Sequence, residues 1–155
     1  MIEKSSLSSK RDIHFPMPSA IMTIGIIADN RMKFNFKLKS IAKNSELTFL
    51  LFDPDKRPKE KSDEVIYVSD LNFWRVPKFK MIDSFVSKPF DILINLMLPD
   101  SDAAQYVCAK SIARFKVGRT KNGRVYDLII DRKEMGIAEF LDEIERTISN
   151  FNSTT

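Results

Sequence analysis

The segment from Phe90 to Asp131 constrains the fold of this chain more than any other part. It reads as an apolar strand over residues 90–98, a helix that starts near Ser101, and a second strand over residues 115–119. An Asn-Gly pair follows at 122–123, and such a pair between β-rich segments favours a two-residue hairpin. We therefore predict a parallel sheet that ends in an antiparallel hairpin at one edge.

The rest of the chain supplies further strands and helices. Residues 20–28 and 47–52 are continuous apolar runs, which are typical of strands buried on both faces. Residues 65–68 are a shorter candidate strand, and apolar spacing predicts helices over 32–44, 79–87 and 136–150. This alternation predicts an α/β fold, a three-layer Rossmann-like domain with a mostly parallel sheet of about six strands. We place strands 20–28 and 90–98 side by side at its centre.

Length and composition predict one domain and an intracellular setting. Residues 20–151 form the expected domain, with a flexible arm at 1–19 and a disordered tail at 152–155. A single cysteine, Cys108, excludes an intramolecular disulfide, and the first residues lack an apolar leader, so we expect a cytoplasmic protein. No apolar stretch reaches the roughly 18 residues of a membrane span, and we expect no membrane partner. The net charge of +4 permits contact with nucleic acid or an anionic membrane surface without favouring either.

Polar residues at the ends of the predicted strands define a candidate cleft. Ligands of open α/β sheets bind beyond the carboxyl ends of the central strands. The candidate residues there are Asp29, Asn30, Asp53, Asn95 and Ser101. Acidic residues at strand ends also cap helices and form turns, which is the more common role. For Asn95, in the middle of an apolar strand, we favour a structural hydrogen bond over a place in the cleft.

The sequence lacks the residue patterns that usually carry catalysis or cofactors. None of its four glycines follows the first strand, and no nucleotide-binding glycine motif is present. One histidine, His14, and one cysteine cannot form a zinc site of the usual kind. A magnesium site of Asp29, Asp53 and Asp100 remains a weak hypothesis. We predict no catalytic residues, no metal and no cofactor, and an inert buried thiol at Cys108.

Two regions of the chain are rich in basic residues and are candidate binding surfaces. Six basic residues occur within fifteen positions that hold no acidic residue: Lys110, Arg114, Lys116, Arg119, Lys121 and Arg124. They predict either solvated surface, which we favour, or a patch for an acidic partner or a nucleic acid. Aromatic and basic residues also alternate over 73–80, a mixture typical of base-stacking platforms. We expect instead that Trp74 packs on the core and that Phe79 lies on the apolar stripe of its helix.

Three segments resemble a family of short, uncharacterised bacterial proteins. They are FDILIN at 90–95, ARFKVG at 113–118 and DLII at 127–130. This resemblance implies a fold and no site residues. A fainter likeness joins residues 91–96 and 114–118 to the N-terminal half of lipopolysaccharide heptosyltransferases. This likeness implies a domain like the acceptor-side half of those enzymes. The chain, however, has neither the second domain of heptosyltransferases nor a glycine-rich turn after the first strand.

These observations favour a non-catalytic module that binds a protein, a small ligand or a second copy of itself. Two alternatives stay open at this point. One is a nucleotide- or sugar-binding, glycosyltransferase-like remnant with its cleft at the strand ends. The other is a nucleic-acid-associated protein that uses the basic hairpin.

Overall fold

The computed structural model describes most of the predicted domain. The described residues are 13, 16–17, 20–31, 45–55, 57, 60–97, 101–120, 124–131 and 135–153. The predicted helix at 32–44, the turn at 122–123, the tip of the tail and most of the N-terminal arm lie outside them, as do His14, Asp100 and Lys121.

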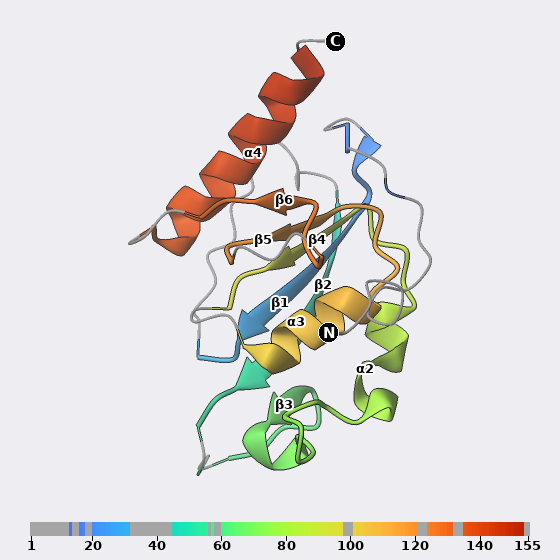
Figure 1. Ribbon diagram of the computed structural model, residues 1–155, viewed down its shortest axis with the longest axis vertical. Helices are drawn as coiled ribbons and strands as arrows, with labels where there is room; N and C mark the ends of the chain where they lie inside the picture. Colours follow the sequence, from blue (N-terminus) through green and yellow to red (C-terminus); the bar gives the residue numbers. More distant parts are fainter. Residues whose placement is uncertain are drawn as a thin grey trace.

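A six-stranded parallel sheet forms the centre of the molecule (Figure 1). Its strands are β1 (Thr23–Asp29), β2 (Glu46–Asp53), β3 (Val65–Tyr67), β4 (Ile92–Asn95), β5 (Lys116–Gly118) and β6 (Leu128–Ile129). They lie in the order β3-β2-β1-β4-β5-β6, and every neighbouring pair is parallel. This is the Rossmann strand order, with the switch point between β1 and β4. The predicted α/β fold and the central position of these two strands are confirmed.

Helices cover both faces of this sheet. In Figure 1, α2 (Phe79–Val86) and α3 (Asp102–Lys110) lie on one side, and α4 (Ile137–Ser153) lies on the other. A short 3-10 helix, η2 (Val68–Asp70), follows β3. The helices meet the sheet through two separate apolar clusters, one on each face. In the part of the chain that is described, no helix has the length and apolar character needed to cross a bilayer.

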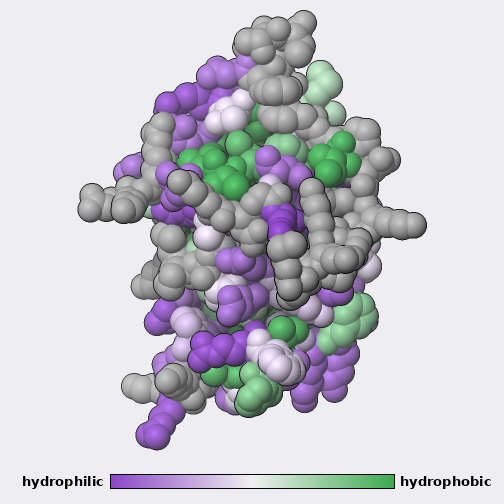
Figure 2. Space-filling model, viewed as in Figure 1, coloured by the Kyte–Doolittle hydropathy of each residue, from purple (hydrophilic) through white to green (hydrophobic). Residues whose placement is uncertain are grey.

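Alternation along the strands decides which side chain enters which cluster. In β1, Ile24 and Ile26 belong to the cluster under α4, whereas Ile27 belongs to the cluster under α2 and α3. In β4, Ile94 faces α4 and Leu93 faces the other side. Successive residues of a strand point to opposite faces, so strands buried on both faces must be apolar throughout. Charged and polar residues (purple) cover much of the outer surface in Figure 2, with apolar patches (green) between them.

The predicted antiparallel edge hairpin was wrong. β5 and β6 pair in parallel, with Val117 opposite Leu128 and Gly118 opposite Ile129. The Asp127 carboxylate accepts a hydrogen bond from the Lys116 amide at 2.9 Å, and the Asp127 amide donates to the Lys116 carbonyl at 2.8 Å. These bonds fix the start of β6 beside the start of β5. The chain therefore leaves the sheet after Gly118 and rejoins it at Leu128 in the same direction as β5.

Candidate functional site

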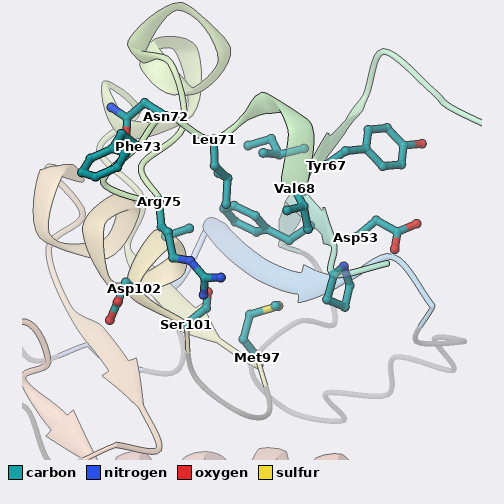
Figure 3. Close-up of a pocket in the computed structure, with 14 residues that line it drawn as sticks. Asp53, Tyr67, Val68, Leu71, Asn72, Phe73, Arg75, Met97, Ser101 and Asp102 are labelled. Carbon is teal, nitrogen blue, oxygen red and sulfur yellow. The ribbon is translucent and has the colours of Figure 1, made fainter. Parts of the chain in front are cut away.

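A cavity of about 600 Å³ opens at the carboxyl ends of β2 and β3 (Figure 3). The 3-10 helix and the loop after it form one wall, and the N-terminus of α3 forms another. The lining residues are Phe52, Asp53, Pro54, Ile66, Tyr67, Val68, Leu71, Asn72, Phe73, Arg75, Met97, Ser101, Asp102 and Ala103. Its position beyond the strand ends agrees with the general location of ligand sites in open α/β sheets.

The cavity brings one cation close to a helix N-terminus. In Figure 3 the guanidinium of Arg75 extends into the cavity toward Ser101, while Asp102 points away from it. Ser101 is the N-cap of α3, and its hydroxyl accepts a hydrogen bond from the Ala104 amide at 3.1 Å. The amides of Asp102 and Ala103, which lie before the first intrahelical bond, have no hydrogen-bond partner among the described residues. This end of the cavity thus offers one positive charge and two amide donors.

A tight loop over residues 71–77 holds Arg75 in place. Leu71 and Pro77 form an antiparallel bridge at its base. The side-chain oxygen of Asn72 accepts hydrogen bonds from the amides of Trp74 at 2.9 Å and Val76 at 3.1 Å. Arg75 has a φ of 60°, in the left-handed region that is uncommon for residues other than glycine. The surrounding bonds therefore maintain a backbone conformation that an isolated loop would not favour.

Two of the five predicted cleft residues line the cavity, and three do not. Asp53 and Ser101 line the cavity. Asn30 is exposed and its amide donates to the Phe52 carbonyl at 2.8 Å, so it joins β1 to β2 without lining the cavity. Asp29 and Asn95 are buried and bind other protein groups. The carboxylate of Asp53 also accepts a hydrogen bond from the Asp55 amide at 2.9 Å.

Asp29 is bound by Arg31. The guanidinium of Arg31 donates to both carboxylate oxygens, at 3.1 and 2.8 Å, and the Arg31 amide donates to one of them at 2.8 Å. Burial raises the pKa of Asp29, but the hydrogen bonds and the charge of Arg31 outweigh this effect and lower the pKa below its usual value. Asp29, the last residue of β1, thus has a satisfied charge and binds the turn that follows the strand.

We expect this ion pair to make the protein sensitive to acid. A carboxyl group whose pKa is lowered by folding stabilises the folded state above its unfolded pKa, and the contribution is lost as the pH falls through the folded value. The stabilisation from Asp29 should therefore be complete at neutral pH and decline below the usual pKa of 3.8. Urea unfolding of wild type and Asp29→Asn at neutral pH and at about pH 2.5 tests this. A stability gap between the two proteins that is as large in acid as at neutral pH would contradict it.

Asn95 forms part of a buried hydrogen-bond network. Its side-chain nitrogen donates to the Tyr126 hydroxyl at 2.7 Å, and its side-chain oxygen accepts from the Met97 amide at 3.0 Å. The ring of Tyr126 lies against Gly118, where a Cβ atom would come within 2.5 Å of it. The favoured structural interpretation of Asn95 agrees with these contacts, because the amide fixes the chain as it leaves β4.

The five described members of the predicted basic patch do not share one surface. Lys116 is 1% exposed and its ammonium donates to the Ala109 carbonyl of α3 at 3.5 Å. Arg119 is buried on the opposite face, where it donates to the Met135 carbonyl and its guanidinium lies 5.0 Å from the centre of the Phe140 ring. Desolvation lowers the pKa of Arg119. Arg114 lies 3.8 Å from Asp91, Lys110 lies over the Tyr106 ring, and Arg124 is exposed.

Residues 2–150 match the sequence profile of a family of unknown function, DUF6913. The chain belongs to this family. No similar curated protein and no similar solved structure was found. The sequence resemblance to an uncharacterised family is thereby confirmed, whereas the fainter likeness to heptosyltransferases stays an untested prediction.

Two aromatic residues of this family member lie where the sequence interpretation did not place them. Trp74 was expected on the core and is 75% exposed, and Phe79 was expected on the buried stripe of α2 and is 60% exposed. Both predictions were wrong. The apolar face of α2 is carried by Ile82, Phe85 and Val86. Arg75 and Asn72, which shape the cavity, were not predicted, because no motif marks them.

The described residues contain no cluster of side chains that is typical of a metal site. No three of their histidine, cysteine, aspartate or glutamate side chains come together as a set of metal ligands. Cys108 is fully buried in the cluster under α3, as expected for an apolar packing residue.

Proposed function

We propose that this protein is a binding module whose cavity holds a small organic monoanion with an apolar body. The observation that carries the proposal is the cavity of about 600 Å³ at the carboxyl ends of β2 and β3. Its volume falls within the range of about 300–1,000 Å³ that is usual for small-molecule sites. Mostly apolar walls with a few placed polar groups are also usual for such sites.

The apolar part of the ligand would rest on the walls of the cavity. Phe52, Ile66 and Leu71 line it from the sheet and the loop, and Met97 lines it from the end of β4. Phe52, Ile66 and Met97 also belong to the cluster under α2 and α3, so this part of the lining is fixed by the core. A preformed wall lowers the entropy cost of binding, because fewer side chains need to be ordered.

The charged part would lie between Arg75 and the N-terminus of α3. Positive charge and free amides at a helix N-terminus favour an anion there. The Asp53 carboxylate also lines the cavity and would repel a highly charged group. A ligand with a single carboxylate therefore fits this site better than one with a polyphosphate. This argues against a nucleoside triphosphate as the ligand.

A thermal-shift panel tests the proposal. The panel holds aliphatic and aromatic carboxylates, sugar nucleotides and nucleoside triphosphates. A carboxylate present at about 100 times its dissociation constant should add about 2.7 kcal/mol of stability. For a chain of this size the melting temperature should rise by about 5–10 °C. A response to sugar nucleotides alone would favour the glycosyltransferase-like alternative, and a wholly flat panel would contradict a small-ligand site for the classes tested.

A substitution of Arg75 tests whether the carboxylate binds in this cavity. Arg75→Ala should weaken carboxylate binding by roughly 10- to 100-fold, because a charge-assisted hydrogen bond contributes about 1.5–3 kcal/mol. Arg146→Ala, which removes an exposed arginine from α4, should leave binding unchanged. Equal losses in the two variants would place the ligand elsewhere.

A further inference from the structure

The segment from residue 71 to residue 80 forms a projecting surface of aromatic and basic side chains. Phe73 is 91% exposed, and Trp74 and Phe79 also lie largely in water. The segment holds no acidic residue, and besides Arg75, whose guanidinium enters the cavity, it holds two lysines, Lys78 and Lys80. It follows β3 and leads into α2, at the lower end of the molecule in Figure 1, where apolar and charged atoms lie side by side in Figure 2.

Hydrogen bonds within the loop fix the backbone that carries the exposed rings of Phe73 and Trp74. Besides the two hydrogen bonds accepted by the Asn72 side chain, the Asn72 amide donates to the Val76 carbonyl at 2.9 Å, and the Arg75 amide donates to the Asn72 carbonyl at 2.9 Å. The rings of Phe73 and Trp74 contact each other edge to face, with their centres 5.3 Å apart. A group of large apolar side chains that is exposed to water commonly marks a site where a protein contacts another surface.

We propose that this segment binds the protein to an anionic membrane surface. Aromatic side chains insert at the level of the lipid headgroups, and neighbouring lysine and arginine side chains attract anionic lipids. The charge of the segment is complementary to such a surface. No helix needs to enter the bilayer, because the contact is made by a loop and the first turn of α2.

Single-stranded nucleic acid, the other partner of aromatic–basic surfaces, fits this geometry less well. Successive bases stack on aromatic faces along a basic groove. Here the planes of Phe73 and Trp74 meet at 86°, so the two rings do not offer parallel faces to neighbouring bases. The loop also projects from the molecule, whereas a flat lipid surface accepts a projecting tip.

Trp74 is the single tryptophan of the chain, so its fluorescence reports directly on this surface. The full-length protein is titrated with vesicles of phosphatidylcholine alone and with vesicles that also contain phosphatidylglycerol. We expect the emission to shift to shorter wavelength with the anionic vesicles, and the shift to decrease as salt is added. Phosphatidylcholine alone should give little or no shift.

Variants assign the contact to named residues by vesicle co-sedimentation. Trp74→Ala should weaken binding by about ten-fold or more, because it removes a large apolar side chain from the interface. Lys80→Gln should weaken it by about five-fold. Two matched changes outside the segment, Met22→Ala and Lys88→Gln, replace an exposed apolar residue and an exposed lysine and should leave binding unchanged. Unaltered melting temperatures show that the variants are folded.

Three results would overturn the proposal. One is the absence of binding to anionic vesicles at low salt. Another is binding that Trp74→Ala and Lys80→Gln reduce no more than the matched changes do. The third is an emission shift that follows addition of a single-stranded oligonucleotide, or an increase in protein concentration, but not addition of vesicles; the segment would then contact nucleic acid or a second copy of the chain.

Discussion

Phe90→Ala is expected to destabilise the protein by about 3–5 kcal/mol, which is a large part of the stability of a domain of this size. Phe90 is 2% exposed and lies in the cluster under α2 and α3, with its ring centre 5.0 Å from that of Phe85. The ring also covers Gly25 in β1, where a Cβ atom would come within 2.7 Å of it. Removing the ring leaves a cavity between the central strand and α2 that a rigid sheet cannot close.

The matched control is Phe79→Ala, which removes the same side chain from the exposed side of α2. Its effect should stay within about 0.5 kcal/mol, as for most surface substitutions. Urea unfolding gives both values. Gly25→Ala should be destabilising in the wild type, where the new methyl group meets the Phe90 ring, and less so in the Phe90→Ala background. Similar losses for the two phenylalanine variants would mean that Phe90 is not a core residue.

The central sheet could be predicted from the sequence because burial on both faces leaves a direct signal. The runs at 20–28, 47–52 and 90–98 have no polar face, and each overlaps a strand of the observed sheet. Strand ends were less well determined: β4 covers only Ile92–Asn95 of the predicted 90–98. The apolar run extends past β4 because Phe90, Leu96 and Met97 are buried although they lie outside the strand.

The edge of the sheet could not be predicted because tertiary contacts decide it. Asn122–Gly123 is a local signal for a hairpin, and local signals are overridden where the neighbouring residues bind elsewhere. Tyr126 packs against Gly118, and Asp127 binds both backbone groups of Lys116. Each contact joins residues that are eight to eleven positions apart, and no periodicity in the sequence records it.

The candidate site was only partly predictable for a similar reason. Asp53 and Ser101 were found because they follow strands, and the strand ends are known once the strands are. Arg75 enters the cavity through the bonding of the 71–77 loop, which depends on Asn72 and on a left-handed residue. The exposure of Trp74 was missed because a tryptophan beside basic residues has the same sequence pattern whether it covers the core or faces water.

Asn95→Leu keeps the branched shape of the side chain but makes it larger and apolar, and it is expected to cost about 2–6 kcal/mol. The substitution removes two buried hydrogen bonds, one to the Tyr126 hydroxyl and one to the Met97 amide, and the loss of each costs about 1–3 kcal/mol. Tyr126→Phe removes only the hydrogen bond between the hydroxyl and the Asn95 side-chain amide, so its cost should be about 1–3 kcal/mol.

The double variant separates a structural role of Asn95 from a role in ligand binding. With both side chains replaced, the hydroxyl and the amide that bound each other are both gone, so the cost should be about 0.5–3 kcal/mol below the sum of the single costs. Because Asn95 does not line the cavity, each variant should still respond to the carboxylate that stabilises the wild type. Additive costs together with a lost ligand response would instead place Asn95 in the binding site, and the cavity beside Arg75 would then be only part of it.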